Sequence, residues 1–273
     1  MTHKIFNLLL VFCLLTSISK AQSISVSPSR FYYKVNPGGI KSQILKVTNN
    51  STAKESFVIT FGDFAAPGTQ GKSVLMKPGE SPNSLVKNIS ANPSFFELEP
   101  GKSQDVQVIL EMPNLPESNK VKWGTLMLKI EKEKKSAKGA TNSDVGMGIL
   151  ETFQFIVHVF QTPPNVTYKK AEIVSFQEVV GDQPTAGRVV AISTKNTGEA
   201  ILDCASYIEY VHLRTGKQVR LKPSAFTVLP GGAREVKFIL PTDLEKGKYN
   251  LTGVVDYGSK EEVQAAEMEI EIK

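Results

Sequence analysis

The chain is poor in the side chains that most enzymes use to bind metals or to attack substrates. After its first 21 residues it has one cysteine, Cys204, and two histidines, His158 and His212, in a sequence of 273 residues. None of these three lies near another in the sequence, and no HExxH, CxxC or GxSxG motif occurs. Metal sites and nucleophilic catalysis need such groups close together. We therefore predict no enzyme activity, no metal site and no cofactor.

Long apolar runs are also missing after the amino terminus. The single such run, IFNLLLVFCLLTSI, follows a short polar start and precedes the small residues Ser19 and Ala21. It is shorter than the ~20 residues that span a bilayer, and its flanks are typical of a secretory signal. We predict a signal peptide over residues 1–21 and an exported, not membrane-spanning protein. The periplasm is the first choice of location, and the cell exterior or surface is the second.

A strong charge of one sign is absent as well. Removing Lys4 and Lys20 with the signal leaves 30 basic against 27 acidic residues, since the whole chain has 32 and 27. The charges are interspersed, which argues against a nucleic-acid partner. Cys204 lies in the apolar run ILDCASYIEY. We expect a buried, inert thiol there, with pairing to a second chain as the alternative.

What the sequence does contain is alternation of apolar and polar residues, interrupted by turn residues every eight to twelve positions. Examples are KSQILKVTNNS, SFVITFG, DVQVILEM and GTLMLKIEK. This pattern predicts short strands of an antiparallel sandwich. The fold class is therefore all-β, with two tandem immunoglobulin-like antiparallel β-sandwich domains after the signal peptide.

The predicted domain boundary lies in QTPPNV, residues 161–166, because adjacent prolines end a strand and stiffen a connector. The domains are then 22–162 and 163–273. They resemble each other weakly in FELEPGKSQDVQVILEMPNL and FTVLPGGAREVKFILPTDL, and each stretch predicts a hairpin with a Pro-Gly turn. Residues 134–148, KKSAKGATNSDVGMG, predict a mobile loop beside a long apolar strand. It is either part of a binding edge or a tolerated surface insertion.

Three stretches in this order resemble the periplasmic pilus-assembly chaperones, the PapD-like family. They are SVSPSRFYYKVNPGGIKSQILKVTNNS, ISANPSFFELEPGKSQDVQVIL and FQFIVHVFQTPPN, and together they cover most of residues 24–165. The second half is similar to the family only in its architecture. The resemblance implies a chaperone or assembly factor whose partner is a pilus or surface-protein subunit that lacks one strand of its own sandwich.

In that family the chaperone lends the last strand of its first domain to the subunit, and two basic residues hold the subunit's terminal carboxylate. By position, Arg30 matches the first of these residues. His158 stands where the family has a lysine. The resemblance places the lent edge at Met147, Ile149, Phe153, Phe155 and Val157, with Glu151 interrupting the apolar series.

A second function class stays open on the same fold. The chain is then a secreted or cell-surface structural or adhesion protein built from immunoglobulin-like domains. In that case Arg30 and His158 only support the packing between the two domains.

Overall fold

The computed structural model describes residues 24–131, 153–180, 187–260 and 262–273, and these residues form strands almost throughout. The signal peptide predicted for residues 1–21 and the loop predicted for 134–148 lie outside the described residues. The strands of the first half are β1 (Ile24–Ser27), β2 (Arg30–Tyr33), β3 (Ile40–Asn49), β4 (Glu55–Ala65), β5 (Val74–Met76), β6 (Ile89–Asn92), β7 (Phe95–Leu98), β8 (Ser103–Glu111), β9 (Lys122–Glu131) and β10 (Gln154–Gln161). A short 3-10 helix, η1 (Pro116–Asn119), precedes β9.

In the second half, all of the described elements are strands. They are β11 (Ala171–Val179), β12 (Val189–Asn196), β13 (Leu202–His212), β14 (Gln218–Arg220), β15 (Ser224–Val228), β16 (Ala233–Ile239), β17 (Gly247–Asp256) and β18 (Gln264–Ile272). The all-β prediction is confirmed.

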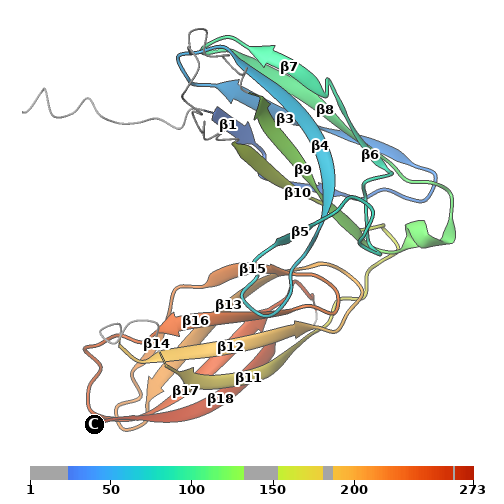
Figure 1. The fold of residues 1–273 in the computed structure, drawn as a ribbon. Coiled ribbons are helices and arrows are strands. Elements are labelled where there is room, and N and C mark those ends of the chain that lie inside the picture. Colours follow the sequence, from blue (N-terminus) through green and yellow to red (C-terminus); the bar gives the residue numbers. More distant parts are fainter. Residues whose placement is uncertain (1–23, 132–152, 181–186, 261) are drawn as a thin grey trace, which may run out of the picture.

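Each half has two sheets with a core between them. In the first half, β1-β3-β8-β6 face β2-β10-β9-β4-β5, with β7 paired to β4. In the second, β11-β12-β16 face β14-β13-β17-β18, with β15 paired to β13. Among these strands the pairing is antiparallel except between β2 and β10, which run parallel. The prediction of two sandwiches is thereby confirmed (Figure 1).

The two cores follow from the period-two patterns, since successive side chains of a strand point to opposite faces. In β3 Leu45 and Val47 are fully buried while Lys46 between them is exposed. The buried residues of each half form a separate cluster. The first core's last strand ends at Gln161 and the second's first strand begins at Ala171. We propose that the domains divide at residues 162 and 163, within this connector.

The hairpins predicted at the two Pro-Gly turns are wrong. β7 pairs with β4 in one sheet and β8 pairs with β3 in the other, so the turn at Gly101 carries the chain across the sandwich. The turn at Gly231 does the same between β15 and β16. Both glycines have the expected positive φ, +74° in each. A Pro-Gly turn therefore fixes the reversal of the chain without fixing which strands pair.

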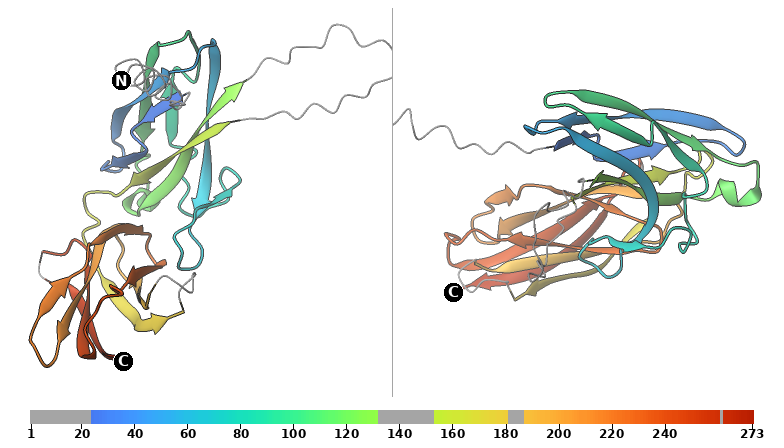
Figure 2. Two further views of the ribbon diagram at one scale, coloured as in Figure 1. Left: turned by 90° about the vertical axis from the view of Figure 1, so that its left-hand side faces the viewer. Right: turned by 45° about the horizontal axis from the view of Figure 1, so that its top comes forward.

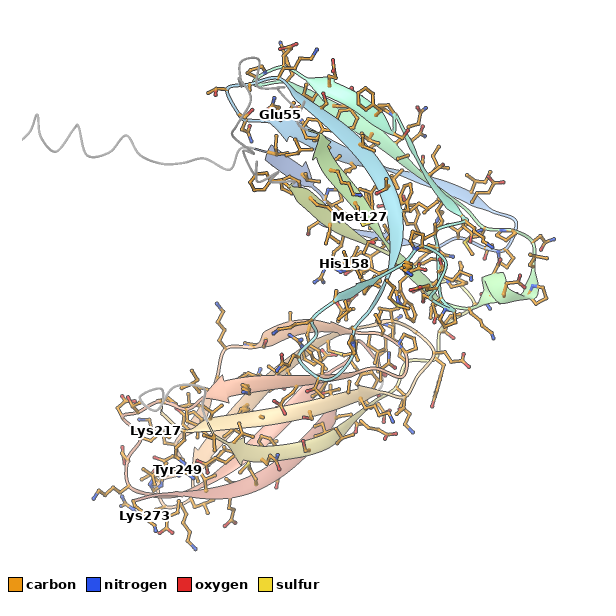
Figure 3. The ribbon with its side chains drawn as sticks, in the orientation of Figure 1. Glu55, Met127, His158, Lys217, Tyr249 and Lys273 are labelled. Atoms are coloured by element: carbon orange, nitrogen blue, oxygen red, sulfur yellow. The ribbon has the colours of Figure 1, made fainter. Side chains whose placement is uncertain are left out.

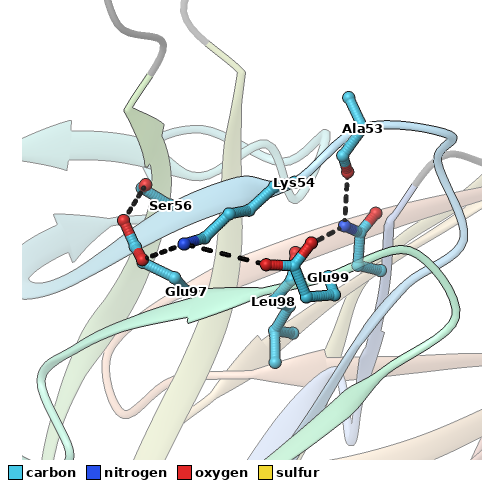
Figure 4. Close-up of polar contacts among 7 residues, drawn as sticks. Ala53, Lys54, Ser56, Glu97, Leu98 and Glu99 are labelled. Carbon is cyan, nitrogen blue, oxygen red and sulfur yellow. Dashed lines mark hydrogen bonds and ion pairs between the residues drawn. The ribbon is translucent and has the colours of Figure 1, made fainter.

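A buried asparagine holds each of these crossing turns. Asn49 donates to the carbonyls of Leu98 and Ala53, at 2.9 and 2.8 Å, and its own carbonyl accepts from the amide of Gly101. Asn196 makes the corresponding bonds to Val228, Ala200 and Gly231. Figure 4 shows the region of Ala53 and Leu98, beside the exposed Lys54–Glu97 ion pair. The weak sequence similarity between the halves thus corresponds to two crossing turns that are held by the same hydrogen bonds.

Cys204 is buried in β13, with 4% of its surface exposed, so the predicted burial is confirmed. Burial, together with the charges of Asp203 and Asp256, raises the pKa of the thiol to about 12. The thiol is therefore protonated at neutral pH, which opposes disulfide formation with a second chain.

Candidate functional site: the cleft between the two halves

The two halves meet at an angle, with a concave side between them (Figures 1 and 2). A third apolar cluster joins them near the connector. Phe64, Trp123 and Phe160 of the first half belong to it, and Ile201 and Leu229 of the second half pack against it. The Trp123 indole donates to the Phe64 carbonyl at 3.1 Å. This cluster fixes the floor of a cleft whose walls come from both halves.

Arg30 and His158 are brought together on the cleft side of the first half. Arg30 opens β2 and pairs in register with His158 of β10. Since paired residues of neighbouring strands point to the same face, both side chains lie on the face that carries Phe160. Figure 3 labels His158 where the first half approaches the second. Both residues line one pocket of about 160 Å³ between the halves.

The Arg30 guanidinium reaches across to the second half. Its Nη1 lies 3.3 Å from the Thr227 hydroxyl of β15, which donates to the carboxylate of Asp203 at 3.0 Å. A single long hydrogen bond to a neutral hydroxyl leaves most of the five donors of the guanidinium available. Arg30 is exposed, so its remaining donors meet solvent.

His158 is half-buried and electrically neutral at pH 7. Burial, and secondarily the positive charge of Arg30, lower the pKa of its imidazole below the ordinary 6.5. Its Nε2 lies 3.0 Å from the Ser73 hydroxyl, and its ring packs edge-on against Phe64. It therefore offers hydrogen bonding and apolar contact rather than charge.

The pocket holds a cation that sequence reasoning missed. Arg234 of β16 lines it together with Arg30 and His158. In the sequence this arginine is part of the unremarkable run GGAREV, and only the packing of the second half against the first brings it to the cleft. Ser73 was missed as well. It belongs to the loop between β4 and β5, and only the folding of the chain brings this loop to the pocket.

The residues predicted for the lent strand have different environments. Val157 is buried in the first core, with 2% of its surface exposed, and Phe155 packs partly buried against that core. Phe153 is 53% exposed. Met147, Ile149 and the interrupting Glu151 lie outside the described residues, and their role stays a prediction.

Among the described residues, the edge of β10 is open over half its length. All eight of its residues pair with β9, whereas only His158–Gln161 pair with β2. The chain leaves the first sheet after β1 and joins the second only at Arg30, so no described strand is registered against Gln154–Val157 on that side. The Phe153 carbonyl accepts a hydrogen bond from Ile130 of β9. By alternation, the main-chain groups of Gln154 and Ile156 point to the open edge.

Within the described ranges there is no group of three or more His, Cys, Asp or Glu side chains arranged to hold a metal ion. No helix in that part of the chain has the length and apolar character needed to cross a membrane.

No protein-family model matches the chain, and no curated protein matches it. Among solved structures it is similar to the E. coli chaperone DraB, at 16% identity over 90% of this chain and 98% of the other, with a TM-score of 0.43. It is also similar to a chain of the CsuC–CsuE chaperone–tip adhesion subunit pre-assembly complex from Csu pili of Acinetobacter baumannii (12% identity; 89% and 98% coverage; TM-score 0.45). A third is from a chaperone–tip adhesin complex of CFA/I fimbriae biogenesis (12% identity; 90% and 98% coverage; TM-score 0.46).

Proposed function

We propose that this protein is an exported, PapD-like chaperone or assembly factor without enzyme activity, and that it binds an incomplete β-domain of a pilus or surface-protein subunit by strand addition. The observation that carries the proposal is the open edge of β10 directly beside Arg30. Four residues of main chain, Gln154–Val157, pair with no described strand on one side and lead into the strand position that holds His158.

An incoming strand gains main-chain hydrogen bonds from Gln154 and Ile156, as in other cases of strand addition to a sheet edge. Such an edge favours pairing with another chain unless it is covered. Phe153 and Phe155 supply apolar side chains next to it, and neither is fully buried. Val157 already belongs to the core, so it anchors the strand and does not enter the partner's groove.

Arg30 is placed to bind the partner's terminal carboxylate. A planar guanidinium forms two charge-assisted hydrogen bonds to a carboxylate. His158 adds a neutral hydrogen-bonding group one strand away. A permanent charge at this position, as the resembled family has, binds an anion more strongly than a neutral ring.

One observation favours the alternative, a structural or adhesion protein of the cell surface. Arg30 bonds to Thr227 across the cleft, and this contact also contributes to packing of the halves. In that reading Arg30 holds the two halves together and no partner terminus enters the cleft.

Affinity capture from an extract of the source organism distinguishes the two. We expect Arg30→Ala to lose a charge-assisted hydrogen bond of about 1.5–3 kcal/mol and to weaken capture of the partner roughly ten- to hundredfold, with little change in melting temperature. His158→Lys should strengthen it. Arg214→Ala, at an exposed turn just after β13, is the matched control. If neither cleft substitution changes the captured proteins, or if Arg30→Ala acts only by lowering the melting temperature, the alternative replaces the proposal.

A further inference from the structure

We infer that the loop between β4 and β5, residues 66–73, is a clasp between the two halves. The clasp opens and closes over Arg234 of β16, and its state sets the angle between the halves. It reaches from the first half toward the second (Figures 1 and 2). The inference concerns the motion of the free molecule, so it holds or fails independently of the proposed function.

The clasp is bound to the second half at the edge of a sheet. β16 is the last strand of its sheet and pairs with β12 on one side. On its other side, the amide of Glu235 donates to the carbonyl of Thr69 in the clasp at 2.8 Å. This is a main-chain bond of the kind that joins neighbouring strands, made by one residue of a loop. Breaking it leaves the pairing of β16 with β12 intact.

The other end of the clasp is bound to the first half. The Ser73 hydroxyl lies 3.0 Å from Nε2 of His158 in β10. Directly after Ser73, β5 pairs with the end of β4. The clasp therefore links the edge of β16 to the residue of β10 that lies in register with Arg30.

The closed clasp covers the guanidinium of Arg234. Nε and Nη1 of this side chain are buried and have no hydrogen-bond partner among the described residues. Gly71 has a φ of +66°, and a Cβ at this position would overlap Nη1, so the loop backbone lies directly against the guanidinium. Burying a charged donor without a partner is costly. Opening the clasp returns these donors to water, and the closed state is therefore opposed by the side chain that it covers.

The apolar cluster near the connector is the second contact between the halves and acts as the pivot. Phe64, Trp123 and Phe160 of the first half meet Ile201 and Leu229 of the second there. Two domains that share a small interface move relative to each other unless a further contact holds them. The clasp supplies such a contact away from the connector, so its opening frees the halves to rotate about the cluster.

The test follows hydrogen exchange of the Glu235 amide in the purified protein. This amide is bonded to Thr69 in the closed state and meets water in the open state. Arg234→Met keeps a long side chain and removes the buried charge, so the protection of Glu235 should rise about tenfold or more. Gly71→Ala should lower the protection by about tenfold, because the added Cβ displaces the loop from the guanidinium.

Two controls separate opening of the clasp from other effects. The amide of Val236 points toward β12, because successive amides of a strand alternate in direction, and its protection should be equal in all variants. Gly68→Ala is the matched control for Gly71→Ala, since Gly68 has a similar φ of +68° and a Cβ added there would meet no atom within 4 Å. It carries the same backbone strain and should protect Glu235 like the wild type.

The angle between the halves is measured by the distance between two spin labels, attached at Lys102→Cys and Lys217→Cys. Both positions are exposed, one in each half, and the buried Cys204 stays unlabelled. We expect one narrow distribution of distances in Arg234→Met and a broader distribution in Gly71→Ala.

The contrary results are equally specific. If neither Arg234→Met nor Gly71→Ala changes the protection of Glu235, or if Arg234→Met lowers it, the arginine does not oppose the closed state and the inference is wrong. If the protection of Val236 changes in parallel, the sandwich itself unfolds and the clasp is not a separate state. If the protection of Glu235 changes while the label distances stay the same, the loop opens without moving the halves, and its control of the angle is wrong.

Discussion

At the scale of the residue, His158 is the group whose chemistry is set most clearly by its surroundings. Its environment combines burial against Phe64, the nearby charge of Arg30 and a hydrogen bond with Ser73. Burial and the charge of Arg30 disfavour the imidazolium form of the ring.

This makes the stability of the protein sensitive to mild acid. Because the folded-state pKa of His158 is below its unfolded value of about 6.5, folding favours the neutral ring. The stabilisation is complete above pH 6.5 and is lost as the pH falls through the folded-state pKa. We expect the melting temperature to fall between pH 7.5 and pH 5, and to fall less in His158→Gln. An unchanged pH profile in that variant, measured by circular dichroism, would show that His158 is not the responsible group.

A second prediction at this scale concerns Asn49 and Asn196, the buried asparagines that hold the crossing turns. Asn196→Ala leaves the carbonyls of Ala200 and Val228 without their buried donor. Leaving buried acceptors unpaired costs about 1–3 kcal/mol each, so the free energy of unfolding should drop by about 2–6 kcal/mol. Asn114→Ala, at an exposed position, should change it little. Denaturant unfolding measures the stability of both variants, and equally small effects would contradict the structural role of Asn196.

The residues of the site were only partly predictable from sequence. Arg30 and His158 were named through a resemblance that covers the first half, and the structure pairs them in register. Arg234 carried no signal, because its place in the pocket depends on how the second half packs against the loop at Gly71. Contacts between sheets that are distant in sequence leave no local pattern.

At the scale of the element, the alternation of apolar and polar residues predicts the strands well. It does not predict which strands pair. The apolar face of β3 or β8 is visible in the sequence because one face is buried. Whether β7 turns back on β8 or crosses to the other sheet depends on the whole sandwich, and the Pro-Gly turn at Gly101 is compatible with both. The open edge of β10 is likewise a property of pairing, since it exists only because β2 begins at Arg30.

The edge makes a prediction about main-chain bonding. Ile156→Pro removes an amide that points to the open side and no amide that bonds to β9, and proline is tolerated on such edges. The free protein should therefore stay folded while capture of the partner is strongly reduced. Val157→Pro, whose amide faces β9 and whose side chain is in the core, should unfold the domain. Normal capture by folded Ile156→Pro would show that the partner does not add a strand here.

At the scale of the whole molecule, two sandwiches are joined by an apolar cluster and by the loop between β4 and β5. The cluster places Phe160 of β10 against Leu229 of the second half. The loop contributes Ser73 and Gly71 to the same pocket. With this loop closed, the strand edge of β10 and the pocket that Arg30 lines are therefore held in a fixed relation.

Amide hydrogen exchange of β10, measured in the free protein and in the complex captured from an extract of the source organism, tests strand addition most directly. We expect the amides of Gln154 and Ile156 to exchange quickly in the free protein and to become strongly protected in the complex. The amides of Phe155 and Val157, which face β9, should be protected in both. A stable complex in which Gln154 and Ile156 still exchange at the free rate would contradict strand addition.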